Sequence, residues 1–330
     1  MGGILIEAAS LLGGLALLVG GGEALVRGAV TLARRLGISP LIVGLTIVGF
    51  GTSAPELVVS VLAAATGSPG LALGNVVGSN MANMMLILGI AALIFPLAVH
   101  RDALRRDGLM MACATVAVLI VGATGRMEAG HGVLMIAALG LYIFGTVWTD
   151  RRKSGSEVAT LHRDEAESYD GLLPGKGWSV ALAIAGGIAA LAAGAHLAVV
   201  GASAIAGRFG VPDEVIGLSV VAVGTSLPEL AAAISAARAR HADVCVGNVI
   251  GSNIFNLLGI AGAASLAAPL PFSPMMVGFD LWALLAVSLL LFFFMATGRI
   301  ISRREGGALL ALYILYMLWH FAVPAPAGAA

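Results

Sequence analysis

Long apolar runs, separated by short segments that carry charge, Pro or Gly, fill almost the whole chain. Each run is close to the roughly 20 residues that a helix needs to cross the hydrocarbon core of a bilayer. The pattern predicts ten membrane-spanning helices, at residues 4–26, 41–65, 71–97, 108–124, 131–148, 178–206, 214–237, 243–268, 276–296 and 307–323. We therefore expect an all-α polytopic protein whose surroundings are the lipid bilayer.

The composition agrees with this interpretation and excludes several classes of protein. Of 330 residues, 59% are hydrophobic and 11% charged, whereas soluble domains carry about 25% charged residues. No protease, hydrolase, P-loop or dinucleotide-binding motif is present in the sequence. The 18 basic and 18 acidic residues leave no net charge to attract nucleic acid. We expect a protein that is not an enzyme and has no bound cofactor, no nucleic-acid partner and no obligatory protein partner.

One long hydrophilic segment, residues 149–177, divides five predicted spans from five others. Its acidic residues lack the ligand spacing of an EF-hand loop, which favours a solvated linker over a calcium sensor. The expected organisation is a first five-helix repeat at 1–148, the linker, and a second five-helix repeat at 178–330.

The distribution of basic residues predicts the orientation, because cytoplasmic loops are enriched in Lys and Arg. With the N-terminus outside, 16 of the 18 Lys and Arg residues fall on the cytoplasmic side, and only Arg126 and Arg208 fall outside. We expect a cell (plasma or inner) membrane protein with both termini outside and a cytoplasmic linker at 149–177.

An internal repeat relates the two halves. Residues 44–83 align without a gap onto residues 217–256, at an offset of 173, with 18 of 40 positions identical. Because each half contains an odd number of predicted spans, the two copies should cross the membrane in opposite directions. Transporters built from such inverted repeats hold their substrate near the bilayer midplane, at interrupted helices.

The first repeated element reads GTSAPE in one copy and GTSLPE in the other. Pro55 and Pro228 lack an N–H group, so each leaves a backbone carbonyl without its helical partner. Beside each proline lie two hydroxyls and one carboxylate, namely Thr52, Ser53 and Glu56, and Thr225, Ser226 and Glu229. Carboxylate, hydroxyl and carbonyl oxygens are the ligands of hard cations. A simple proline kink would not explain a glutamate at the same place twice.

The second repeated element reads GNVVGSNMAN and GNVIGSNIFN. It places polar residues at four-residue steps on one helical stripe, as Asn75, Ser79 and Asn83, and as Asn248, Ser252 and Asn256. Ser79, Asn83, Ser252 and Asn256 are the favoured ligands, whereas hydrogen bonding between helices competes evenly with ion contact for Asn75 and Asn248. Two other acids, Glu7 and Asp280, are expected to reach the outer interface.

The paired GTSxPE and GNVxGSNxxN motifs resemble the α-repeats of the sodium/calcium exchanger branch of the calcium/cation antiporter superfamily. The resemblance implies that the first and sixth spans slide across a core of the other eight spans. It also implies a diamond of ion sites in the second, third, seventh and eighth spans. The implied ligands are Thr52, Ser53, Glu56, Ser79 and Asn83 in the first copy, and Thr225, Ser226, Glu229 and Ser252 in the second. Asn256 stands where some microbial relatives have Asp and others have Asn.

These observations predict a Na+/Ca2+ antiporter in which both ions compete for a midplane site between Glu56 and Glu229. Two carboxylates balance one Ca2+, or a set of Na+ ions on the same oxygens. Ca2+ and Na+ are then substrates, not cofactors. A H+/Ca2+ antiporter, a K+-dependent cation antiporter and a cation channel remain as alternatives.

Overall fold

The computed structural model describes residues 2–35, 51–99, 104–152, 177–238, 240 and 242–322. In the first half of the chain its helical segments, with η marking a π-helical turn, are α1 (Gly2–Arg35), α4 (Ala54–Ala65), α5 (Pro69–Met81), η2 (Ala82–Ile87), α6 (Leu88–Ile94), η3 (Leu104–Gly108), α8 (Leu109–Ala123) and α9 (Ala129–Arg152). In the second half they are α11 (Gly177–Phe209), α12 (Asp213–Ile216), η4 (Gly217–Val221), α13 (Ala222–Thr225), α14 (Leu227–Arg238), α15 (Ala242–Ile254), η5 (Phe255–Ile260), α16 (Ala261–Ala267), η6 (Met276–Asp280), α17 (Leu281–Gly298) and α18 (Arg303–Ala322).

The expected all-α membrane architecture is confirmed. Within the described ranges, eight helices are long and apolar enough to cross a membrane, and the bent pair Asp213–Thr225 and Leu227–Arg238 makes a ninth. The span expected at 41–65 is described only from residue 51 onward, and most of the expected linker lies outside the described residues. The total of ten spans therefore remains a prediction.

The helix α1 ends nine residues later than expected, at Arg35 instead of residue 26. Charge marks where a chain leaves hydrocarbon, but it does not end a helix, because Arg is a good helix former. Glu23, inside the expected span, and Arg27, at the start of the extension, lie one turn apart and form an ion pair.

Four short strands show that the inverted symmetry extends beyond the repeated motifs. The strands β1 (Leu97–Ala98) and β4 (Ile300–Ile301) pair antiparallel, and so do β2 (Arg126–Met127) and β3 (Leu270–Pro271). The offset of 173 carries β1 onto β3, and an offset of 174 carries β2 onto β4. The pseudo-two-fold axis therefore exchanges the two strand pairs, as expected for inverted repeats.

The core of the molecule is formed by two spans, one from each half. In the spans Pro69–Ile94 and Cys245–Ala267, 78% of the apolar window is buried, compared with 22–33% in the other six single-helix spans. Outward side chains of the peripheral helices are apolar, for example Leu134 and Phe144 on α9, both 70% exposed. Such a surface is suited to lipid, and the polar residues of the repeats lie inside it.

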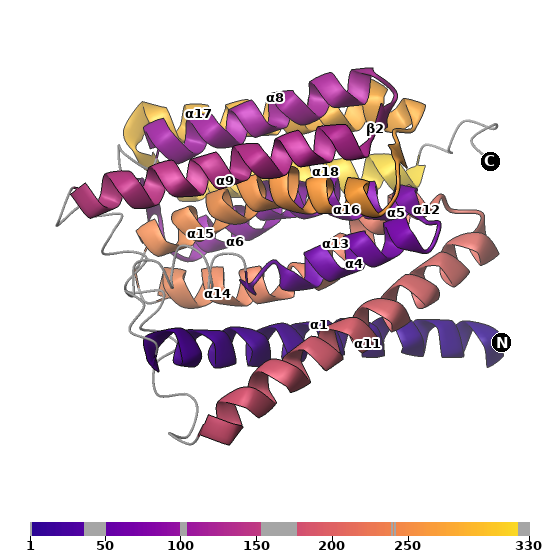
Figure 1. Ribbon diagram of the computed structural model, residues 1–330. Helices are drawn as coiled ribbons and strands as arrows, with labels where there is room; N and C mark the ends of the chain where they lie inside the picture. Colours follow the sequence, from indigo (N-terminus) through magenta and orange to yellow (C-terminus); the bar gives the residue numbers. More distant parts are fainter. Residues whose placement is uncertain are drawn as a thin grey trace.

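The helices α1 and α11 cross each other on one side of the remaining bundle (Figure 1). Glycines let their backbones touch: a Cβ at Gly14 would lie 2.5 Å from the backbone nitrogen of Ala198, and a Cβ at Gly187 would lie 2.7 Å from that of Leu25. Small residues give membrane helices this close approach. The first and sixth spans are therefore packed on each other as a pair.

Candidate cation site

Both proline motifs break their helices at the expected place. The helix α4 starts directly after Ser53, and α14 starts directly after Ser226; these two serines have nearly the same backbone angles, φ −88° and ψ 11°, and φ −83° and ψ 10°. Glu56 and Glu229 lie in the first turns of the new helices. The positive end of a helix dipole favours a carboxylate at this position.

Two hydrogen bonds connect the helix break of one half with the helix break of the other. Ser53 Oγ donates to Glu229 Oε1 over 2.8 Å, and Ser226 Oγ donates to Glu56 Oε1 over 2.9 Å. All four side chains are at most 1% exposed. Each glutamate is thus bound to a hydroxyl of the opposite repeat, and both carboxylates lie at the interface between the repeats.

The residues of the second motif lie on the two most buried spans. Ser79 and Ser252 lie on α5 and α15, while Asn83 and Asn256 lie on the π-helical turns η2 and η5. All four are fully buried. The two π-helical turns coincide under the offset of 173, and such turns are frequent at functional sites. Hydrophobic periodicity contains no signal for them.

The candidate site is rich in buried oxygen atoms that have no hydrogen-bond partner among the described residues. Seven of the ten expected ligand residues each contribute one such atom: Thr52 Oγ1, Glu56 Oε2, Ser79 Oγ, Asn83 Oδ1, Glu229 Oε2, Ser252 Oγ and Asn256 Oδ1. Leaving a buried polar atom unpaired costs roughly 1–3 kcal/mol. A set of carboxylate, hydroxyl and amide oxygens with two formal negative charges is suited to a hard cation.

Of the other three expected ligands, Ser53 and Ser226 donate to the two glutamates, and Thr225 donates to Asn75. Thr225 Oγ1 lies 3.1 Å from Asn75 Oδ1, and Asn75 Nδ2 donates to Ser60 Oγ over 2.9 Å and to the Glu56 carbonyl over 3.3 Å. Asn75 therefore bridges the second and seventh spans, which favours the hydrogen-bonding interpretation at this position. Ser60 is replaced by Ala233 in the second half, so this support is not repeated there.

Sequence reasoning missed Asn253 and its counterpart Asn80, which lie off the stripe of the motif. Asn83 Nδ2 donates to Asn253 Oδ1 over 3.2 Å, and Asn253 Nδ2 lies 3.6 Å from the sulfur of Met111. Asn253 thus holds the amide of Asn83 and leaves its oxygen free. Both asparagines recur in the GSN segment of the two motif copies, and that repetition was the available signal.

The expectation that Asp280 reaches the outer interface is wrong. Its side chain is fully buried, and it accepts a hydrogen bond from Tyr316 over 2.8 Å and lies 2.7 Å from His320 Nε2. Polar partners on α18 hold it inside the protein, which sequence spacing did not reveal. Glu7 is paired with Arg208, across the ends of α1 and α11.

Comparisons with known proteins converge on one family. A family model described as "Sodium/calcium exchanger protein" matches residues 6–148 and 179–322. The sodium/calcium exchanger MaX1 of Methanosarcina acetivorans is 34% identical, over 94% of this chain and 97% of its own length. The inner membrane protein YrbG of Escherichia coli is 35% identical, over 87% and 88%. The structure of the sodium-calcium exchanger NCX_Mj soaked with 10 mM Na+ and 10 mM Sr2+ is 29% identical, with a TM-score of 0.64, over 95% of this chain and 98% of its own.

Proposed function

The chain belongs to the sodium/calcium exchanger protein family, and we propose that it exchanges Na+ for Ca2+ across a membrane through one midplane site between Glu56 and Glu229. The observation that carries the site is the set of seven buried, unpartnered oxygens among the described residues. A bound cation would satisfy these atoms together. The family contains transporters, and a transporter holds these ions as substrates, not as cofactors.

The proposed ligands come from four spans and both repeats. They are Thr52, Ser53, Glu56, Ser79 and Asn83 of the first repeat, and Thr225, Ser226, Glu229, Ser252 and Asn256 of the second. The two carboxylates supply a charge of minus two, and the other groups are neutral. One Ca2+ neutralises this charge, and so do two Na+ ions. Asn256 adds an oxygen without a third negative charge.

Competition for the same oxygens would couple the two ions. A site filled by Ca2+ has no carboxylate left for Na+, and the reverse also holds. Without any cation, two carboxylates in a low-dielectric interior are strongly unfavourable. The empty carrier would therefore seldom change its orientation, so that transport proceeds by exchange and not by leakage.

We propose that movement of the pair α1 and α11 opens the site to one side of the membrane at a time. These helices pack on each other through glycines, so they would slide as one body over the other spans. The charge distribution supports an orientation with both termini outside and the linker 149–177 in the cytoplasm of a cell (plasma or inner) membrane. The halves 1–148 and 178–330 would then open the site alternately to the two sides.

Ca2+ uptake into proteoliposomes preloaded in turn with Na+, K+ or acid tests the proposal. We expect Ca2+ uptake only into vesicles that were loaded with Na+. Protein-free vesicles are the control. Uptake driven by acid or K+ would replace the proposal with a H+/Ca2+ or K+-dependent antiporter. Uptake that needs no counter-ion would indicate a channel. If more than two Na+ move per Ca2+, each excess charge couples transport to the membrane potential by about 2.3 kcal/mol per 100 mV.

A further inference from the structure

The side chain of Asn75 connects the two helix breaks, and both of its polar atoms have partners within the protein. Its amide nitrogen Nδ2 donates to the Glu56 backbone carbonyl over 3.3 Å and to Ser60 Oγ over 2.9 Å. Its oxygen Oδ1 accepts a hydrogen bond from Thr225 Oγ1 over 3.1 Å. Asn75 and Ser60 are both fully buried. The amide of Asn75 is therefore fixed from both sides.

The Glu56 carbonyl decides which end of this amide faces Thr225. A backbone carbonyl can only accept a hydrogen bond, so the NH2 group of Asn75 must lie beside it. The amide oxygen therefore faces Thr225, and it too can only accept. The second partner of the Thr225 hydroxyl is the Ala222 carbonyl at 3.2 Å, which is again an acceptor. Thr225 is thus a donor towards both partners, and the lone pairs of its oxygen remain available to a cation.

A competing acceptor lies in the candidate cation site itself. The Thr225 hydroxyl lies near the Glu56 carboxylate, whose Oε2 has no hydrogen-bond partner among the described residues. Carboxylates form strong hydrogen bonds with hydroxyls, so a Thr225 proton that lost its acceptor on Asn75 would be donated to Glu56. That bond would turn a proton into the site and occupy an oxygen that the cation needs. Asn75 keeps the proton on the other side of the hydroxyl.

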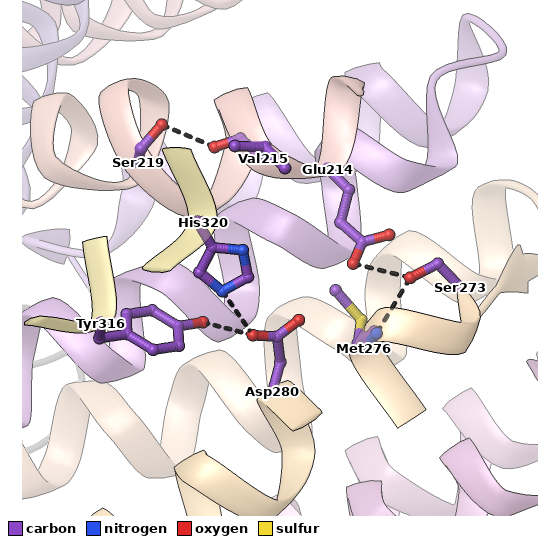
Figure 2. Close-up of polar contacts among 8 residues, drawn as sticks. All are labelled: Glu214, Val215, Ser219, Ser273, Met276, Asp280, Tyr316 and His320. Carbon is purple, nitrogen blue, oxygen red and sulfur yellow. Dashed lines mark hydrogen bonds and ion pairs between the residues drawn. The ribbon is translucent and has the colours of Figure 1, made fainter. Parts of the chain in front are cut away.

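Backbone packing holds α5, which carries Asn75, against the first part of the seventh span. A Cβ at Gly74 would lie 2.3 Å from the Glu214 carbonyl oxygen, and a Cβ at Gly217 would lie 3.0 Å from the Asn75 backbone nitrogen. Figure 2 shows the start of this span, where the Glu214 carboxylate accepts a hydrogen bond from Ser273 Oγ over 2.8 Å. The two segments thus pack backbone to backbone next to Asn75, which keeps its amide within reach of the seventh span.

The second half has no equivalent arrangement in the part of the chain that the structure describes. The offset of 173 carries Asn75 onto Asn248, and Ala233 replaces the serine that supports the first amide. Thr52 is the counterpart of Thr225, and its Oγ1 has no hydrogen-bond partner among the described residues. One threonine of the pair is therefore oriented by an amide, and the other is not.

We propose that Asn75 is a positioning residue for cation binding, which orients the Thr225 hydroxyl as a ligand and has no counterpart acting on Thr52. This inference rests on the proposed cation site, and it adds a residue that does not touch the ion. Groups behind the ligands of a metal ion commonly fix the ligands in this way. Thr225 is then a prepared ligand, whereas the ion itself has to orient the hydroxyl of Thr52.

A double-mutant cycle tests the proposal, with Ca2+ binding to the purified full chain measured by titration calorimetry. Asn75→Ala should raise the Ca2+ concentration for half-saturation by about 3-fold to 10-fold, because one oriented ligand is lost. Thr225→Val removes the hydroxyl, so Asn75→Ala should have little further effect in that background. Thr225→Ser keeps the hydroxyl and should retain the full effect of Asn75→Ala. Equal effects of Asn75→Ala in all three backgrounds would overturn the proposal, because Asn75 would then act on folding alone.

The counterpart cycle is the matched control. Asn248→Ala and Thr52→Val should change the half-saturating Ca2+ concentration independently of each other, because no hydrogen bond joins these two side chains among the described residues. Coupling in this cycle as large as that between Asn75 and Thr225 would overturn the proposal, since the effect would then not depend on the observed hydrogen bonds.

Ser60→Ala provides an independent variant if Asn75→Ala does not fold, because it introduces the residue that the second half has at this position. It removes one acceptor of the Asn75 amide, so we expect a smaller rise in the half-saturating Ca2+ concentration, again absent with Thr225→Val. An unchanged affinity in Ser60→Ala would overturn the proposal. A wild-type chain that binds no Ca2+ would overturn the proposed function as well, whereas intact binding without coupling would overturn this inference alone.

Discussion

Glu56 and Glu229 are each held by a serine of the opposite repeat, and each keeps one carboxylate oxygen without a partner among the described residues. The serines fix the direction of the carboxylates, and hydrogen bonds to a charged group contribute about 1.5–3 kcal/mol. In the proposed site, the two free oxygens would be left to bind the cation. The affinity of a divalent site depends on how many of its ligands are charged.

Glu56→Gln and Glu229→Gln should each abolish Ca2+ exchange, because one formal charge is lost from a divalent site. We expect Ca2+ affinity to fall by at least about tenfold, or 1.4 kcal/mol, while the protein still inserts. Ca2+ binding and exchange by reconstituted variants measure this effect. Glu7→Gln, which removes an acid at the end of α1, is the matched control and should transport. Near-normal Ca2+ flux in either site variant would remove that glutamate from the site.

Asn253 should act by positioning Asn83. Asn253→Ala frees the amide of Asn83, so we expect the Ca2+ concentration for half-maximal exchange to rise by about 3-fold to 10-fold, for a lost buried hydrogen bond of about 1 kcal/mol. The matched variant is Asn80→Ala, because among the described residues Asn80 Nδ2 donates only within its own helix, to Val76 O at 2.7 Å. An equal or larger effect of Asn80→Ala would contradict this role of Asn253.

At the scale of elements, the site depends on irregular helices. Breaks after Ser53 and Ser226 create new helix starts in the second and seventh spans, and π-helical turns place Asn83 and Asn256 in the third and eighth. The helices α1 and α11 are instead continuous, and their glycines let the two backbones pack closely on each other. The molecule thus combines irregular helices at the site with regular helices in the pair proposed to slide.

Adjacent glycines of α1 allow a controlled test of this pair. A Cβ at Gly14 would collide with the backbone of α11, whereas a Cβ at Gly13 meets no atom within 4 Å among the described residues. Gly14→Ala should therefore destabilise the protein by about 1–3 kcal/mol and slow exchange, and Gly13→Ala should do neither. Thermal unfolding and initial exchange rates measure both effects. If the two variants behave alike, close packing of α1 on α11 is not needed.

At the scale of the whole molecule, the inverted repeat is nearly but not fully symmetric. Thr115 and Ser288, which are 173 residues apart, lie within 3.3 Å of each other and so mark the pseudo-two-fold axis. Away from the axis the halves differ, since Asn75 is supported by Ser60 in one half and Ala233 replaces that serine in the other. Such differences would make the outward-open and inward-open states of the carrier unequal in free energy. Two identical inverted repeats would instead give both states the same free energy.

Labelling of single cysteines tests the orientation, in a chain from which Cys113 and Cys245 have been removed. Arg126→Cys and Arg208→Cys should react with a membrane-impermeant thiol reagent on intact cells. Arg238→Cys and Arg303→Cys should react only after the membrane is opened, because the predicted orientation puts both positions on the cytoplasmic side. Labelling in the reverse pattern would mean that the protein is inserted the other way round.

The sequence by itself determined the features that arise from local chemistry. Apolar length predicted the membrane spans, Pro55 and Pro228 predicted the two helix breaks, and the offset of 173 predicted the inverted halves. All ten expected ligand residues proved to be at most 6% exposed. These predictions succeed because a bilayer permits few backbone arrangements, and because a proline removes its own hydrogen bond wherever it lies.

Only the tertiary structure decided which polar groups meet. The sequence does not show that Ser53 bonds to Glu229 and not to Glu56, because the partners are 176 residues apart. It also left Asp280 at the interface, whereas packing of α18 on η6 encloses the aspartate with Tyr316 and His320. The physical reason is that spacing along a helix gives the direction of a side chain relative to its own axis, while its partners depend on how that helix rotates and crosses against the others.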